Sequence, residues 1–132
     1  MTGVEWVVEA YGCNPAPLSD LDTMRGLFAR MVRELNLHPC GEAQWRQFPE
    51  SRGITGLYLL SESHLACHTF PEYSSLCLNL FCCRPRTEWD FSGQLRQIFG
   101  AQGVNVRRLE RPYVASADEV ASACVVSGSH KA

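Results

Sequence analysis

Apolar residues occupy alternate positions between residues 74 and 83, which is the period of a β-strand with one buried face. Leu76, Leu78, Leu80 and Cys82 fall on one face, and Cys77, Asn79, Phe81 and Cys83 fall on the other. Further strands are predicted at residues 4–11, 44–48, 54–62 and 104–109, where valine, isoleucine, leucine and aromatic residues gather between turn residues. Without a bulge, one face of the strand that starts at Ile54 carries Thr55, Leu57, Leu59, Ser61 and Ser63.

Two stretches instead have the three- and four-residue spacing of amphipathic helices. The first follows Ser19 and Asp22, which resemble a helix cap, and ends before Pro39; its apolar stripe is Leu21, Met24, Phe28, Met31 and Leu35. The second is expected to begin at Thr87 with Asp90 and to stop at Gly100 and Gly103; it contains Phe91, Leu95, Ile98 and Phe99.

The predicted order is strand, helix, two strands, two further strands, helix and strand. Two helices are too few to cover both faces of such a sheet. We therefore expect an α+β fold: a two-layer α/β sandwich in which a mostly antiparallel sheet carries both helices on one face. The open face then needs a partner. Residues 1–113 form the single domain, and residues 114–132, poor in large apolar groups, are expected to be a loosely held tail.

Composition narrows the class of protein. A chain of 132 residues is one domain by length, and 45% hydrophobic with 20% charged residues is typical of a globular protein. The net charge of −2 gives no footprint for nucleic acid or an anionic membrane. No apolar run approaches the ~20 residues of a membrane helix, and Glu5 and Glu9 stand where a signal peptide would be apolar. We therefore expect a cytoplasmic protein.

Seven cysteines are many for this length. Their number is odd and no pair has the Cys-x-x-Cys spacing, so the sequence argues against a disulfide framework and a structural zinc site. We expect most of them to be small buried hydrophobic residues.

The chemistry concentrates between Ser61 and Tyr73. The Ser63 hydroxyl can attack the carbonyl of Glu62 and replace the amide by an ester, and a histidine such as His68 can move the protons near neutral pH. The run Glu62-Ser63-His64, followed by the run His68-Thr69-Phe70-Pro71-Glu72-Tyr73, resembles the self-cleavage segment of bacterial and archaeal S-adenosylmethionine decarboxylases. Cys83 matches a strand-ending cysteine of that family. These blocks cover roughly residues 53–83, with weaker similarity through residue 113.

The resemblance implies cleavage between Glu62 and Ser63 into fragments 1–62 and 63–132. It implies a covalent pyruvoyl cofactor derived from Ser63, which forms a Schiff base with S-adenosylmethionine and drains electrons during loss of carbon dioxide. It assigns His68 to processing, with Thr55 in support, and Cys83 to proton donation. Phe48 and Phe70 would stack on adenine, and Glu72 would bind the ribose. The product would supply aminopropyl groups for spermidine synthesis.

The same resemblance implies a homodimer packed sheet to sheet in four α/β/β/α layers. Four departures from the family pattern stand out: Thr55 for serine, Phe70 for tryptophan, Cys82 for threonine, and a loop from Phe48 to Gly53 that is one residue longer. The family pattern leaves the roles of Cys82 and Glu5 open. It also does not indicate whether an activator binds. Relatives that decarboxylate arginine or ornithine leave the substrate open, as does an uncleaved chain that regulates an active partner.

Individual residues also have other readings. His64 and His68 share a face and could be two metal ligands, although no third ligand is evident, so no metal site is predicted. Cys83 could be a core cysteine, or the nucleophile of a cysteine hydrolase with His68. Phe48 and Phe70 could be core aromatic residues, Glu72 a solvated turn residue, and Thr55 an ordinary strand threonine.

Overall fold

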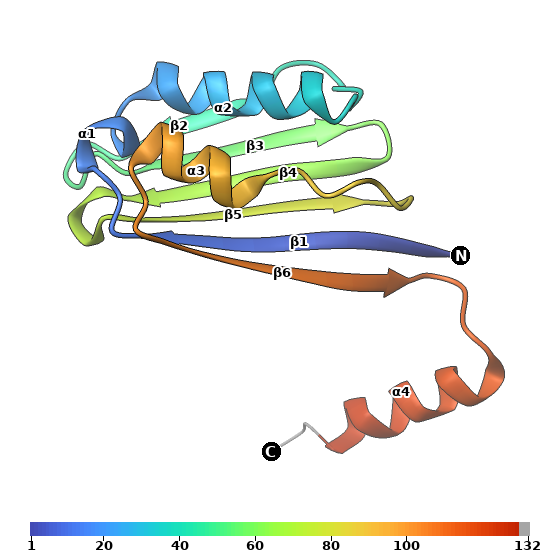
Figure 1. Cartoon of the computed structure of the whole chain (residues 1–132). Coiled ribbons are helices and arrows are strands. Elements are labelled where there is room, and N and C mark those ends of the chain that lie inside the picture. The colour runs from blue at the N-terminus through green and yellow to red at the C-terminus, as the bar shows by residue number, and fades with distance from the viewer. Residues whose placement is uncertain (130–132) are drawn as a thin grey trace.

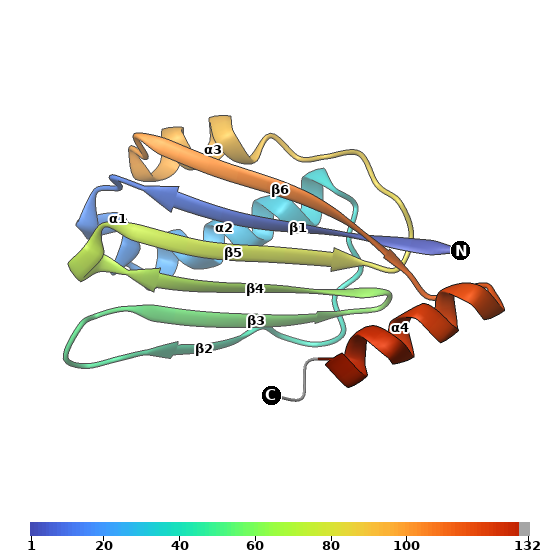
Figure 2. The same ribbon diagram turned by 90° about the horizontal axis from the view of Figure 1, so that it is seen from below.

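The structure, a computed structural model, describes residues 1–129, with side chains through residue 123. One six-stranded antiparallel sheet runs through it in the order β2-β3-β4-β5-β1-β6 (Figure 2). The strands are β1 (Thr2–Tyr11), β2 (Gln44–Gln47), β3 (Ile54–Leu60), β4 (Ser63–Phe70), β5 (Ser75–Cys82) and β6 (Gly103–Pro112). The predicted α+β class and the antiparallel sheet are confirmed.

Helices α2 (Leu21–Glu34) and α3 (Phe91–Phe99) lie on one face of the sheet, as predicted (Figure 1). A short helix α1 (Pro15–Leu18), not predicted, precedes α2, and a 3₁₀ turn η1 (Pro71–Tyr73) joins β4 to β5. The other face carries no helix packed against it in the described part of the chain. Helix α4 (Ala117–Ser129) stands off beyond the end of β6 on that side (Figure 1). None of the described helices has the length and apolar character needed to cross a bilayer.

The core fills the space between the helices and the covered face of the sheet. Alternate residues of the central strands point into it, as the period of two predicts: Val4, Trp6, Val8, Leu65, Cys67, Leu76, Leu78, Leu80 and Cys82. Met24, Phe28, Met31, Leu95 and Phe99 meet them from the helices. The buried hydroxyl of Thr69 accepts from the Ile54 amide (2.8 Å) and donates to the Leu18 carbonyl (2.7 Å), so it ties β4 to β3 and α1.

The predicted helix starts were wrong by a few residues. Asp20, not Ser19, is the cap residue of α2, and the Ser19 hydroxyl donates to the Pro15 carbonyl in the preceding turn. Helix α3 begins after Asp90, whose carboxylate accepts from the Gly93 amide (3.0 Å), and not at Thr87. At α3 the difference arises because the Asp90 carboxylate caps a free amide group of the first turn. The Asp20 side chain makes no such bond to the backbone and accepts instead from the Thr23 hydroxyl (2.6 Å).

A second prediction was wrong at the end of β3. The chain turns at Ser61 and Glu62, so Ser63 begins β4 and pairs with Leu60 across the turn. Leu60 is buried under the helices, whereas Leu57 and Leu59 are on the open face. The turn therefore moves Ser63 away from the face that carries Thr55, Leu57 and Leu59, and puts it on the helix-covered face.

Candidate active site

The turn between β3 and β4 is fixed by backbone hydrogen bonds on both sides. The Ser61 amide donates to the His38 carbonyl (2.7 Å), and the Cys40 amide donates to the Leu59 carbonyl (2.9 Å). On the other side, the Cys83 amide donates to the Glu62 carbonyl (2.9 Å). The carbonyl that precedes Ser63 is therefore polarised by a backbone N–H group from the end of the neighbouring strand.

A cavity of ≈ 340 Å³ opens at this turn and is lined by Ser61, Glu62, Cys83, Arg84 and Tyr113. The Tyr113 hydroxyl donates to the Cys83 carbonyl (3.1 Å), which anchors the chain after β6 beside the cavity. Arg84 lies 3.7 Å from the Glu62 carboxylate. Both side chains are solvated, so the pair contributes little to stability. The predicted cleavage site and Cys83 are thus brought together.

His68 lies in a different place, at mid-strand on the open face of the sheet. Its Nδ1 is 3.1 Å from the Thr55 hydroxyl, and the register puts it directly opposite Cys77 on β5. Cys77 in turn lies opposite Glu9 on β1. Burial, and to a lesser degree the Glu9 carboxylate, raises the pKa of the Cys77 thiol against an opposing effect of Arg107. The structure thus brings Thr55 and His68 into direct contact, and their roles in processing stay a prediction.

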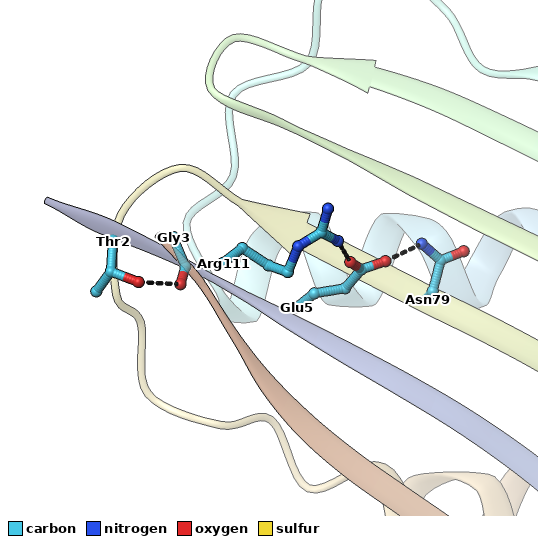
Figure 3. Close-up of polar contacts among 5 residues, drawn as sticks. All are labelled: Thr2, Gly3, Glu5, Asn79 and Arg111. Atoms are coloured by element: carbon cyan, nitrogen blue, oxygen red, sulfur yellow. Dashed lines mark hydrogen bonds and ion pairs between the residues drawn. The ribbon is translucent and has the colours of Figure 1, made fainter. Parts of the chain in front are cut away.

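Two half-buried carboxylates extend this polar surface across β1. The Glu5 carboxylate accepts from Asn79 Nδ2 (3.1 Å) and from Arg111 (Figure 3). Glu9 accepts from Asn105 (3.1 Å) and from Arg107 Nη2 (2.5 Å) in the same way. A cavity of ≈ 210 Å³ is lined by both carboxylates together with His68, Cys77 and Asn79. The sequence did not predict these ion pairs; the only hint is that two glutamates and two arginines have the same four-residue spacing, at positions 5 and 9 and at positions 107 and 111.

The three predicted substrate residues gather near the His68 end of the sheet. Phe48 follows β2 and is 42% exposed, and Phe70 ends β4 and is 37% exposed. Both lie at the same end of the sheet, because the Phe48 amide donates to the Gly53 carbonyl (2.8 Å) and Gly53 lies beside the Thr69 backbone. Glu72 is exposed in η1. The rings are thus not core residues, which removes the alternative reading for both.

Ser63 and His68 are not brought together within one chain. They are five residues apart on β4, which corresponds to roughly 16 Å along a strand, and they point to opposite faces. His64 stacks on Phe81 with ring centroids 5.5 Å apart. Among the described residues no group of three His, Cys, Asp or Glu side chains could hold a metal ion. The predicted site residues therefore fall into two separate groups in the described chain, which we call half-sites: one at the turn and one on the open face.

Comparison with known proteins shows which family has this sequence pattern. The family model described as S-adenosylmethionine decarboxylase matches residues 4–112. The chain belongs to the S-adenosylmethionine decarboxylase family. The match reaches all six strands and so extends well beyond residues 53–83, where the motifs lie. The membership expected from the sequence is confirmed.

Individual relatives of this decarboxylase family agree along most of their length. The chain is 30% identical over 106 residues to the S-adenosylmethionine decarboxylase proenzyme of Moorella thermoacetica, which covers 80% of this chain and 83% of the relative. The proenzymes of Carboxydothermus hydrogenoformans (29% over 106 residues, 80% and 82%) and Pyrococcus abyssi (26% over 110 residues, 83% and 78%) are also similar. All three are named as proenzymes.

Proposed function

We propose that this chain is a proenzyme that cleaves itself between Glu62 and Ser63 and then decarboxylates S-adenosylmethionine with the pyruvoyl group so formed. The observation that carries the proposal is the hydrogen bond from the Cys83 amide to the Glu62 carbonyl, at the turn immediately before Ser63. Membership of a family whose relatives are named proenzymes supports the same reading.

Self-cleavage has a balanced chemical route through these residues. Attack of the Ser63 hydroxyl on the Glu62 carbonyl breaks the C–N bond and leaves an ester, with the negative charge developing on the carbonyl oxygen. The Cys83 N–H is aimed at that oxygen, and one such donor contributes typically ~10²- to 10³-fold to a rate. Removal of the Ser63 α-proton then expels the Glu62 carboxylate and leaves dehydroalanine. Its addition of water with loss of ammonia gives the pyruvoyl group.

The residues around Ser63 fit such a group. The cavity of ≈ 340 Å³ opens beside the cleavage site, and Cys83 lines it. A pyruvoyl group would supply an electron sink for loss of carbon dioxide. We assign Cys83 to donate the proton that replaces the carboxylate, because its half-buried thiol lines the same cavity.

The second half-site supports a homodimer. A catalytic base must come within about 3 Å of the proton it removes, and His68 lies too far along β4 to serve Ser63 of its own chain. Leu57, Leu59 and Leu109 expose apolar surface on the open face. We propose that two open faces pack together in four layers, so that His68 and Thr55 of one copy approach the Glu62–Ser63 bond of the other from its open-face side, where His68 would take up the Ser63 α-proton. Phe48, Phe70 and Glu72 would then hold the substrate's adenosine.

The proposed product is an aminopropyl donor for spermidine synthesis, and the cytoplasmic location expected from the sequence stays a prediction. Intact mass of the purified chain tests the central claim. We expect two fragments that correspond to residues 1–62 and 63–132, the second without a free amino terminus. Ser63→Ala is the matched control and must remain one chain. A wild-type protein that remains uncleaved would overturn the proposal.

Substrate choice needs its own measurement. Cleaved protein is incubated with S-adenosylmethionine, arginine or ornithine, each labelled at the carboxyl carbon, and released carbon dioxide is counted. Release from S-adenosylmethionine, lost in Phe70→Ala, is the expected result. Release from arginine or ornithine alone would show the pyruvoyl chemistry with a different substrate.

A further inference from the structure

The thiol that faces the Ser63 side chain is that of Cys82. Ser63 and Cys82 are partners across β4 and β5, and their side chains lie on the helix-covered face. Partners of this kind have Cβ atoms about 5 Å apart. Cys83 comes one residue later, and strand alternation directs its side chain to the other side of the sheet. The two adjacent thiols therefore lie on opposite sides of the bond to be cleaved.

The geometry of a sheet makes this side important. Peptide planes in a sheet lie near the plane of the sheet, and side chains stand roughly perpendicular to it. The Glu62 carbonyl oxygen points within that plane to the Cys83 amide. A nucleophile must reach the carbonyl carbon from above or below the peptide plane. The Ser63 hydroxyl meets this condition only from the helix-covered face, which is the face that carries Cys82.

Burial favours the neutral thiol of Cys82, and the polar side chains of Ser63 and Arg86 lie next to it. Its side chain is 1% exposed, and burial raises the pKa of the thiol. The Arg86 charge and the polar side chains of Ser63 and Arg86 act on the pKa in the opposite direction. Arg86 is itself fixed, because its Nη1 donates to the Leu35 carbonyl after α2 (2.8 Å). A neutral thiol is a poor base but can accept the proton of the Ser63 hydroxyl in a hydrogen bond.

We propose that Cys82 is a positioning residue for self-cleavage: its sulfur holds the Ser63 hydroxyl over the Glu62 carbonyl, and Cys83 supplies the opposite amide and acts after cleavage. This inference rests on the proposed function. A serine side chain has three staggered orientations, and the contact with sulfur selects one of them. The effect is on the rate at which the precursor is cut, because residue 63 loses its link to Glu62 afterwards.

The test measures the rate of cleavage by intact mass after synthesis of the precursor is stopped. Cys82→Val and Cys82→Ala remove the polar partner, and we expect each to slow cleavage about 2- to 10-fold, as for the loss of one neutral hydrogen bond. Cys82→Ser and Cys82→Thr replace the thiol by a hydroxyl, which can still accept the Ser63 proton, and should be cleaved at a rate close to that of the wild type. Cys67→Val is the matched control, since Cys67 is equally buried on the same face of β4 but has no contact with the turn.

Each outcome decides the inference. If the wild type is cleaved, and Cys82→Val and Cys82→Ala are cleaved at the same rate as the wild type, the role of Cys82 is overturned and the proposed function stays intact. Slow cleavage in the serine and threonine variants as well would reduce Cys82 to a packing residue and also overturn it. If Cys82→Val fails to fold, judged by circular dichroism, the comparison of Cys82→Ala with Cys82→Ser still decides. A wild-type chain that never cleaves would instead defeat the proposed function.

Discussion

Joint expression of two inactive variants would reveal whether the active site is shared between copies. Ser63→Ala removes the proposed nucleophile from one copy, and His68→Ala removes the proposed base from the other. Each variant alone should remain uncleaved. In a mixed dimer with shared sites, the intact Ser63 of the second variant faces the intact His68 of the first, so one of the two sites contains both groups.

The expected yield follows from the separation on β4. Roughly 16 Å along the strand excludes transfer of a proton within one chain, since the groups must be about 3 Å apart. With equal expression and random pairing, about half of the His68→Ala chains have a Ser63→Ala partner and should be cleaved. The Ser63→Ala chains should all stay whole. The mixture should contain four species: the two whole variants and the two fragments of the cleaved His68→Ala chain. Intact mass distinguishes them, because the two substitutions change the mass by different amounts.

The result that refutes this reasoning is equally plain. If His68→Ala chains remain whole in the mixture while dimers are present by size-exclusion chromatography, the two half-sites do not meet across an interface. If His68→Ala is cleaved on its own, His68 has no part in processing. Wild type mixed with Ser63→Ala is the control for pairing, and its wild-type chains should still be cleaved.

Three further outcomes can be measured. Thr55→Val removes the hydroxyl next to His68 Nδ1 and should slow processing about 2- to 10-fold, whereas Thr55→Ser should not, as followed by intact mass. Leu59→Glu, at a position 65% exposed on the open face, should give monomers in size-exclusion chromatography, with the free energy of unfolding changed by only about 0.5 kcal/mol. Val120→Glu on α4 is the control and should leave the dimer intact. A dimeric Leu59→Glu protein would contradict the proposed interface. Burial raises the pKa of Cys67 to about 12 from 9.0, so its contribution to stability is complete below pH 9.0 and is lost as the pH rises toward 12; the unfolding free energy of wild type should fall by up to about 4 kcal/mol more than that of Cys67→Val over this window, and parallel curves would contradict the shift.

Local patterns predicted most of the fold because they depend on neighbouring residues alone. The period of two in residues 74–83 assigned the buried face of β5 correctly down to Cys82. The apolar stripe after Ser19 predicted α2 and its inner face, since packing of that stripe outweighs the weak helix propensity of Gly26.

The turn at Ser61 and Glu62 could not be predicted in the same way. It contains no glycine, proline or asparagine, and Ser61 alone is a weak turn signal, so the apolar pattern predicts an unbroken strand. Its position is set by tertiary hydrogen bonds from the Cys83 amide and to the His38 carbonyl, which are remote in sequence. The face occupied by Ser63, and hence its contact with Cys82, follows from that turn and from the register of β5.

The spatial arrangement of the candidate site could not be predicted from the sequence, and the roles of its residues stay a prediction. The motif around Ser63 and His68 pointed to their chemistry, and the structure adds that they point to opposite faces of one strand. The ion pairs of Glu5 with Arg111 and of Glu9 with Arg107 depend on the pairing of the first strand with the last. No local signal specifies which distant strand a segment joins.

The strand order also determines what a cut after residue 62 leaves behind. The fragment 1–62 would contain β1, β2 and β3, and the fragment 63–132 would contain β4, β5 and β6. Because β1 is inserted between β5 and β6, the two products are interlocked along three junctions: β3 with β4, β5 with β1, and β1 with β6. The proposed scission would therefore change the covalent connectivity without releasing a piece, and dissociation of the products would require extraction of a central strand from the sheet.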